Sequence, residues 1–373
     1  MRVAVHAPLK PPDHPVPSGD RRMVRLLIAA LERAGHPTEV ASRLRSRDPD
    51  GDPRRQTRLY DLGQRLAARY VRRVRRRPVE RRPAAWLTYH LYYKAPDWVG
   101  PAAARALGIP YLVAEASLAP KRAGGPWDDG HRQVEAALAQ AAAVLTLNPA
   151  DAACLPPTAR QVALAPFLDT APFDSAAPDR AAVAHKFVLD PEQPWLIAVG
   201  MMRPGDKLTS YRLLAQALLR LSGRPWQLLA VGDGPARADV EAALAPLGGR
   251  VRCVGEITED ALPDLLAASD LCVWPAVNEA YGMALLEAQA AGIPVVAGAS
   301  GGVPSIVADG EAGLLTPPGE AGALARAVAM LLDNPARRVL MGQAAAAKVR
   351  RDHSIDAAAQ RLDALLAELT EPA

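Results

Sequence analysis

The sequence predicts an α/β protein made of two Rossmann-like domains, each built on a parallel sheet, and three observations lead to this fold class. Its 373 residues exceed one ordinary hydrophobic core and suit two domains of about 150 to 200 residues each. Short apolar runs alternate with helical patterns, as they do in parallel sheets with right-handed crossovers. This alternation occurs twice, before and after a stretch rich in proline, aspartate and alanine at residues 165–194.

The first half alternates strands and helices. Strands are expected at residues 2–7, 38–41, 86–93, 110–116 and 143–147. A helix opens at Ser18-Gly19-Asp20 and stops at Gly35, and further helices are expected at 59–74, 101–107 and 131–141. A doubly wound sheet places its ligand crevice at the turn between the first strand and the first helix. Gly19 is therefore a candidate site residue, and a plain helix-capping turn is the alternative.

The second half repeats the alternation. Strands are expected at 195–199, 227–231, 251–254, 271–274, 294–297 and 313–315. Helices are expected at 209–221, 236–244, 261–268, 281–291, 321–332, 335–349 and 355–369. The sequence thus predicts a first domain at 1–170, a linker at 171–193, a second domain at 194–350 and a C-terminal helix at 351–373.

Cysteine usage and hydropathy indicate the compartment. The three cysteines, Cys154, Cys253 and Cys272, are scattered and odd in number, so they suggest neither a disulfide framework nor a zinc-binding spacing. No apolar run approaches the roughly 18 to 20 residues of a spanning helix, and the N-terminus enters a strand pattern without the layout of a signal peptide. We expect a cytoplasmic protein, either soluble or peripheral on the inner face of the cell membrane.

Arginine is concentrated in residues 43–82, although the net charge of the chain is only +4. Within this region arginines surround apolar residues at helical spacing, which predicts a basic amphipathic helix: Leu59, Leu62, Leu66, Tyr70 and Val74. One interpretation is contact of the basic 59–82 segment with an anionic membrane surface, at about 1 kcal/mol per nearby arginine. The other is a solvated helix that packs its apolar stripe on the first sheet. Nucleic acid is not an expected partner, because no recognition motif accompanies the charge.

Two carboxylates, Glu279 and Glu287, flank the expected start of a helix in residues 270–302. This helix is expected to start near Tyr281, where backbone N–H groups and the positive end of the helix dipole can accept a phosphate. Glu287 lies about one and a half turns further in, at about 1.5 Å per residue, within reach of a ribose hydroxyl. A diphosphate cradle is one interpretation, and an ordinary capped amphipathic helix with two solvated glutamates is the other.

The ordered residues around these carboxylates resemble a known signature. A strand ending in proline is followed by an E-x7-E pair, an aromatic-glycine pair, an alanine-rich helix, a strand and a double glycine: Pro275, Glu279, Tyr281-Gly282, Glu287-Ala288, Ala290, Gly292, 294–297 and Gly301-Gly302. This run resembles the donor site of family 4 retaining glycosyltransferases, the glycosyl transferases group 1. The resemblance implies a GT-B fold, in which an acceptor-side domain and a nucleotide-sugar-binding domain face each other across a cleft and the C-terminal helix crosses back to the first.

The resemblance also implies site residues. Lys207 matches the family's diphosphate-binding lysine, Arg203 is a substitute for an arginine usually found at Met201, and Glu279 would face the sugar ring; these three are the expected catalytic residues. Glu287 would hold the ribose hydroxyls. The other expected donor-binding residues lie at the helix start, in the GDGP turn, beside the base and in the first domain: Tyr281, Gly282, Met283, Gly234, Glu256, Ile257 and Gly19. No metal and no other cofactor is implied.

His90 and Glu115 fall at strand ends of the first domain, so they are acceptor-side candidates, with core or capping roles as the alternative. The chain departs from the family at Met201, at Ala116, where many members have histidine, and at Ser305, where glutamate is usual. The expected function is retaining, metal-independent hexosyl transfer from a nucleotide sugar to a glycan or lipid-linked acceptor, in cell-surface polysaccharide or glycolipid synthesis. A non-catalytic nucleotide-sugar-binding scaffold and a sugar-phosphate synthase of the same fold are the alternatives.

Overall fold

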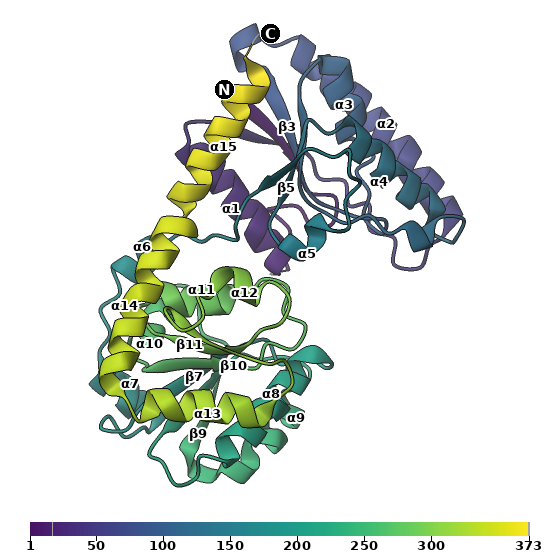
Figure 1. Cartoon of the computed structure of the whole chain (residues 1–373). Helices are drawn as coiled ribbons and strands as arrows, with labels where there is room; N and C mark the ends of the chain where they lie inside the picture. Colours follow the sequence, from purple (N-terminus) through teal and green to yellow (C-terminus); the bar gives the residue numbers. More distant parts are fainter. Residues whose placement is uncertain (17, 372–373) are drawn as a thin grey trace. The chain divides into compact units, whose positions relative to one another are not determined.

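Two separate six-stranded parallel sheets organise the chain. The computed structural model describes residues 1–16 and 18–371, and their contacts divide into two units. Unit 1 contains Met1–Ala165 and the C-terminal segment from Ile355, and unit 2 is Pro166–Ser354. Each unit surrounds its own sheet with helices, which confirms the predicted class of an α/β protein with two Rossmann-like domains (Figure 1).

The unit 1 sheet has the strand order β2-β1-β3-β4-β5-β6. Its strands are β1 (Arg2–His6), β2 (Thr38–Ser42), β3 (Pro83–Leu91), β4 (Tyr111–Ala116), β5 (Ala143–Thr146) and β6 (Gln161–Ala163). Its helices are α1 (Gly19–Arg33), α2 (Pro53–Arg75), α3 (Gly100–Leu107), α4 (Asp128–Gln140), α5 (Pro149–Ala152) and α15 (Ile355–Thr370). The last helix, drawn in yellow in Figure 1, packs along α1, where Arg33 bonds to Asp356 at 2.7 Å.

The unit 2 sheet has the order β12-β11-β10-β7-β8-β9. Its strands are β7 (Trp195–Val199), β8 (Gln227–Val231), β9 (Val251–Gly255), β10 (Leu271–Trp274), β11 (Val295–Gly298) and β12 (Gly313–Thr316). Its helices are α6 (Ala171–Asp174), α7 (Arg180–Phe187), α8 (Asp206–Leu219), α9 (Arg237–Leu244), α10 (Leu262–Ala267), α11 (Met283–Ala290), α12 (Val303–Ile306), α13 (Ala321–Leu332) and α14 (Pro335–Asp352). The expected linker at 171–193 therefore contains two short helices and lies within unit 2.

The two helices that border the predicted donor site start at other residues than the sequence pattern indicates. α8 starts at Asp206 rather than at residue 209, directly after Gly205, whose φ is +83°. Lys207 consequently lies in the first helical turn. α11 starts at Met283, after Gly282 with φ +75°, so Tyr281 lies in the preceding loop. Glycine adopts these left-handed conformations without the penalty of a Cβ, which is why the two helices begin where they do.

The core of unit 1 contains a histidine and an aspartate whose side chains are both excluded from solvent, and we call them the sealed pair. His6 Nδ1, at the end of β1, lies 2.9 Å from Asp97 Oδ1, and both side chains are 0% exposed. Asp97 also accepts hydrogen bonds from two backbone N–H groups at the start of α3 and from the hydroxyls of Thr88 and Tyr111. Burial alone would raise the pKa of Asp97, but the charge of His6 and these donors lower it to about 2.

The basic helix α2 packs its apolar stripe into unit 1. Tyr70 and Val74 are 3% and 0% exposed, and Leu66 is half-buried. The helix begins at Pro53, several residues before the predicted start, because Asp52 caps it by accepting the N–H of Arg54. Across residues 1–16 and 18–371 no helix combines the length and apolar character that a bilayer crossing requires.

Candidate functional site

The loops that leave β7 and β10 carry an ion pair at the carboxyl edge of the unit 2 sheet. Lys207, in the first turn of α8, places Nζ 2.6 Å from Oε2 of Glu279, which lies between β10 and α11. Their side chains are 24% and 16% exposed, so the pair is partly shielded and still reachable from solvent. The carboxyl edge is where open parallel sheets bind ligands. The structure thus brings together two of the three predicted catalytic residues.

Trp274, the last residue of β10, contacts both members of this pair. Its Nε1–H donates to Glu279 Oε2 at 3.1 Å, and the Lys207 ammonium lies 5.3 Å from the centroid of its ring. Tyr211 meets the indole edge-on, with ring centroids 5.0 Å apart and an interplanar angle of 80°. The indole is 2% exposed. A buried aromatic ring therefore fixes the place where the lysine and the glutamate meet.

The start of α8 also holds the backbone of the Glu279 loop. Val277 N–H donates to the hydroxyl of Ser210 at 3.1 Å, and the side-chain amide of Asn278 donates to Asp206 Oδ1 at 3.0 Å. Val277 and Asn278 lie two residues and one residue before Glu279 in the sequence. The loop is therefore tied to the same helix that carries Lys207.

The double glycine that follows β11 supports the loop from another direction. Gly302 N–H donates to the carbonyl oxygens of Glu279 and Ala280, at 3.2 and 3.1 Å. A Cβ placed on Gly301 would lie only 2.0 Å from the carbonyl oxygen of Glu279, and Gly301 has a φ of +55°. Both the close approach and the left-handed backbone require glycine. This contact gives a physical reason for the double glycine in the sequence signature.

Three turns at the same edge are joined by backbone hydrogen bonds. Met202 N–H donates to the carbonyl of Asp233 at 2.9 Å, and Gly232 N–H donates to the carbonyl of Gly255 at 2.8 Å. A Cβ on Gly234, whose φ is +149°, would lie 2.4 Å from the carbonyl oxygen of Met202. The predicted GDGP turn therefore lies against both the loop after β7 and the turn after β9.

The other donor-binding candidates of unit 2 differ in burial. Glu287, on α11, is 4% exposed. Together with burial, which is the larger cause, its charge raises the pKa of the neighbouring Cys272 thiol to about 12. Arg203 and Glu256 are exposed, Gly282 is buried, and four candidates are half-buried: Ile257, Tyr281, Met283 and Gly234. Their assignments to the diphosphate, the ribose and the base stay predictions.

In unit 1, the acceptor-side candidates form a cluster with a third residue. His90 Nδ1 lies at hydrogen-bond distance, 2.8 Å, from Asp20 Oδ1 and 3.9 Å from Glu115 Oε1. Burial would raise the pKa of Asp20, but the hydrogen bond and the charge of His90 lower it. His90 and Glu115 both have a φ of +61°, a conformation that costs a non-glycine residue of the order of 1 kcal/mol or more. Such strain is typical of functional sites.

Gly19 is the first residue of α1, and Ser18 caps this helix by accepting the N–H of Arg21. A Cβ on Gly19 would meet no atom within 4 Å. The chain itself therefore does not require glycine at this position, and the capping role belongs to Ser18. A contact of Gly19 with the donor or the acceptor stays a prediction.

Comparison with known proteins shows which proteins the chain resembles. Residues 193–334 match the family Glycosyl transferases group 1. In this segment, which is less than half of the chain, the protein is similar to that family. It is 35% identical over 254 residues to the 2-deoxystreptamine glucosyltransferase of Streptomyces kanamyceticus, a match that covers 64% of this chain and 65% of that protein. The chain spans about half to two thirds of the length of the first curated relatives that it matches.

Solved structures share the architecture of the whole chain. The sucrose-phosphate synthase of Thermosynechococcus elongatus has a TM-score of 0.71 at 23% identity, covering 99% of both chains. The Anabaena protein HepE in complex with UDP has a TM-score of 0.73 at 19% identity, covering 99% of this chain and 100% of that one. At these identities the likeness concerns the fold, and it confirms the GT-B prediction.

Sequence reasoning misses several residues that build this candidate site. The sequence pattern marks Trp274 only as the end of a strand, and Asp20 only as part of a helix opening. A signal for the tryptophan exists in the sequence, since an aromatic residue directly before Pro275 lies at the carboxyl edge of a buried strand. No comparable signal marks Ser210, because a serine inside a helix is ordinary.

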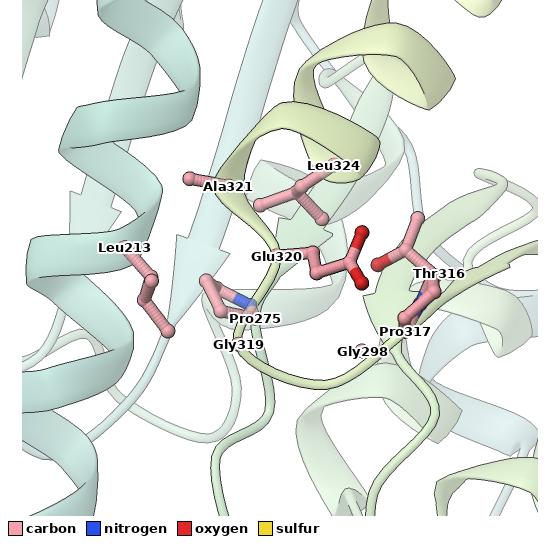
Figure 2. Close-up of a pocket in the computed structure, with 9 residues that line it drawn as sticks. All are labelled: Leu213, Pro275, Gly298, Thr316, Pro317, Gly319, Glu320, Ala321 and Leu324. Carbon is pink, nitrogen blue, oxygen red and sulfur yellow. The ribbon is translucent and has the colours of Figure 1, made fainter.

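A small cavity lies at the same edge of the unit 2 sheet, on the side of α13. Figure 2 shows that Pro275, Gly298 and Thr316, which end or follow three neighbouring strands, line it together with Leu213 of α8 and Leu324 of α13. Its volume of about 10 Å³ is no more than one water molecule needs. The cavity is therefore too small for a nucleotide and is a feature of the packing between sheet and helices.

Proposed function

We propose that this chain is a group 1 glycosyltransferase, which moves a sugar from a nucleoside-diphosphate sugar to an acceptor with retention of anomeric configuration. The Lys207–Glu279 pair at the carboxyl edge of the unit 2 sheet carries the proposal. It places a cation for a diphosphate next to an anion for the sugar. Two similar proteins support the proposal: one curated relative is named a glucosyltransferase, and one structural neighbour was solved with UDP.

In this proposal, the basic groups stabilise the leaving diphosphate. Departure of the diphosphate develops negative charge on its oxygens and an oxocarbenium-like sugar. Lys207 supplies a compact charge, and the exposed guanidinium of Arg203 supplies a fork that can bind two oxygens. The N-terminus of α11, beginning at Met283, adds its dipole. These groups perform the charge stabilisation that a divalent metal provides in other phosphate sites.

The two carboxylates have separate tasks. Glu287, buried on α11, holds the ribose hydroxyls, and Glu279 faces the sugar and stabilises positive charge near the anomeric carbon. The bond from the anomeric carbon to the phosphate oxygen breaks, and the acceptor oxygen attacks from the face that the diphosphate leaves. The released phosphate oxygen takes the acceptor proton. Attack on that face retains the configuration.

The acceptor is a glycan or a lipid-linked sugar of cell-surface polysaccharide or glycolipid synthesis, and His90, Asp20 and Glu115 contact its hydroxyl groups. The cluster combines donors and acceptors of hydrogen bonds, and the strained backbone of His90 and Glu115 supports a functional role. Replacement of His90 by Ala is expected to raise KM for the acceptor while donor hydrolysis persists. An unchanged acceptor KM would remove the cluster from the proposal.

Peripheral attachment to an anionic membrane surface through the basic 59–82 segment belongs to the same proposal. Beside α2, a groove of about 370 Å³ is lined by Arg43, Arg69 and Arg73 together with apolar residues of β2 and α2. We expect the protein to sediment with vesicles containing phosphatidylglycerol and not with phosphatidylcholine vesicles. Charge reversal at Arg72, Arg73, Arg75 and Arg76 should abolish the sedimentation with phosphatidylglycerol vesicles. Equal sedimentation of the wild-type protein with both vesicle types would contradict the attachment.

A thermal-shift panel with UDP, GDP, ADP, dTDP and CMP, with and without EDTA, tests the donor class. A ligand at 100 times its dissociation constant stabilises by about 2.7 kcal/mol. We expect one diphosphate to raise Tm equally with and without EDTA. A shift that EDTA abolishes would contradict metal independence, and the absence of any shift would contradict the binding of a nucleoside diphosphate.

Glu279→Gln separates an enzyme from a binding protein. The scaffold alternative draws on Met201, which is 48% exposed in the position of the family's arginine. If the chain is an enzyme, the variant loses sugar transfer and donor hydrolysis and keeps its affinity for the nucleoside diphosphate, because Lys207 and Glu287 are unchanged. Activity that appears only when a sugar phosphate is supplied as acceptor would identify the synthase alternative.

A further inference from the structure

Glu279 depends on two hydrogen-bond donors that bind the same oxygen. Its Oε2 accepts the ammonium of Lys207 at 2.6 Å and the indole N–H of Trp274 at 3.1 Å. With 16% of its side chain exposed, this carboxylate receives little compensation from water. The two donors together therefore determine where the charge of Glu279 lies.

The two donors differ in whether a bound diphosphate can draw them away from Glu279. Lys207 is a flexible point charge, and in the proposed reaction an incoming diphosphate competes with Glu279 for its ammonium group. The indole N–H is a single donor in a fixed direction, and nothing in the proposed reaction draws it away. When the lysine turns to the diphosphate, the indole still holds the glutamate.

The surroundings of Trp274 keep the indole in place. Tyr211 packs edge-on against it, and the Tyr211 hydroxyl donates to the carbonyl of Gly200 at 2.7 Å. A Cβ on Gly200 would lie 2.9 Å from Cη2 of the indole, so the loop after β7 closes on the ring. The ring also contacts Lys207 through its face, at 5.3 Å from the centroid.

We propose that Trp274 is a positioning residue of the glycosyl-transfer site. It acts through Glu279, whose carboxylate it holds toward the sugar while Lys207 binds the diphosphate, and through Lys207, whose ammonium rests on its ring. This inference rests on the proposed function. It adds a residue whose task becomes important once the donor is bound.

Trp274→Phe removes the N–H and keeps an aromatic ring for Tyr211 and Lys207. The matched control is Trp226→Phe, because Trp226 is also buried in unit 2, at 1% exposure, and its N–H also donates a hydrogen bond, to Leu221 at 2.9 Å. It directly precedes β8, at the amino end of the strands. Both variants lose one indole hydrogen bond, and only one of them loses it next to Glu279.

With the sugar nucleotide as donor, we expect Trp274→Phe to lower kcat about 10-fold or more, as befits the loss of a hydrogen bond to a charged group. Its Kd for the nucleoside diphosphate should stay within about 2-fold, and Trp226→Phe should keep the kcat of the wild-type protein. The inference is overturned if kcat of Trp274→Phe is unchanged, or if its kcat and nucleotide affinity change no more than in the control.

A double-mutant cycle in urea tests the contact without any turnover. Trp274→Phe and Glu279→Ala should together shift the unfolding midpoint by less than the sum of their separate shifts, because each removes the same hydrogen bond. Additive shifts overturn the inference. Absence of transfer by the wild-type protein with every sugar nucleotide contradicts the proposed function instead, and the cycle still decides whether Trp274 holds Glu279.

Discussion

An acid–base pair near the carboxyl end of a central strand can be compared between the two units, and the two pairs differ in how they are solvated. His6 and Asp97 in unit 1 lie 2.9 Å apart with both side chains 0% exposed. Lys207 and Glu279 in unit 2 lie 2.6 Å apart with exposures of 24% and 16%. The two pairs therefore lie in different environments, since His6 and Asp97 are excluded from solvent and Lys207 and Glu279 are partly exposed.

Their hydrogen bonding differs in the same direction. Asp97 accepts from His6, from two backbone N–H groups and from two hydroxyls, which fills the capacity of a carboxylate of about four lone pairs. The described residues give Glu279 two donors, both at Oε2. A saturated, sealed carboxylate stabilises a fold, whereas a carboxylate with spare capacity can accept a ligand. The saturation of the carboxylate separates the structural pair from the pair that we propose to be catalytic.

The strongest way to break this comparison is to remove the lysine. Lys207→Ala should lower the rate of sugar transfer about 10²- to 10³-fold, the usual effect of deleting one group that stabilises developing charge. Its Tm should fall less than that of Asp97→Asn, because the pair is partly exposed and Trp274 still donates a hydrogen bond to Glu279. Steady-state kinetics and a melting curve check both expectations. A large fall in Tm would show that this pair is structural too.

The next largest effect is expected in the sealed pair. Asp97→Asn should destabilise unit 1 by about 3 kcal/mol, because it leaves a buried histidine and several donors without their charged partner. Urea unfolding measures this. Asp356→Asn is the control, because Asp356 pairs with Arg33 at the surface, where the side chain of Arg33 is 62% exposed and that of Asp356 is 53% exposed. This variant should lose less than about 1 kcal/mol of unfolding free energy. Equal losses in the two variants would contradict the role of burial.

The sequence predicts the proposed catalytic pair, Lys207 and Glu279, better than it predicts the pair of His6 and Asp97. Lys207 and Glu279 stand in ordered motifs beside strand ends, so the alternation of strands and helices already places both at one sheet edge. His6 and Asp97 are 91 residues apart in sequence, and no motif marks Asp97 as the partner of His6. Its role becomes visible only when the start of α3 brings its N–H groups to the carboxylate.

The sequence also does not predict which side chains support the site. The helical pattern of α8 begins at residue 209, so the pattern assigns the first turn, which carries Asp206 and Lys207, to a loop. The left-handed backbone of Gly205 decides this start, and periodicity does not report it. The link from Trp274 to Glu279 depends on the path of a loop that hydrogen bonds from α8 fix.

The third prediction concerns the backbone that carries Glu279. Gly301→Ala should reduce transfer and destabilise unit 2 by about 2 kcal/mol, because its Cβ would lie 2.0 Å from the carbonyl oxygen of Glu279. Gly319→Ala is the control, since Gly319 also has a positive φ, +80°, but open space around its Cβ. It should show only backbone strain of about 1 kcal/mol and full activity. Loss of activity in the control alone would contradict the close-approach argument.

The smallest expected effect is the pH dependence of the stability that Asp97 of the sealed pair provides. The pKa of Asp97 is about 2 in the folded chain, against an ordinary value of 3.8 for an aspartate side chain, so folding is favoured by its ionised form. The associated stability, about 2 kcal/mol, is fully present above pH ~4 and is lost as the pH falls through the folded pKa, with about 1 kcal/mol gone by pH ~3.

Urea unfolding of the wild-type protein and of Asp97→Asn between pH 5 and 3 isolates this contribution, because the other carboxylates titrate in both proteins. The difference in unfolding free energy between the two should shrink by about 1 kcal/mol as the pH falls to 3. A difference that stays constant for Asp97→Asn would mean that the sealed pair does not hold its charge through the fold, and the contrast between the two pairs would then rest on exposure alone.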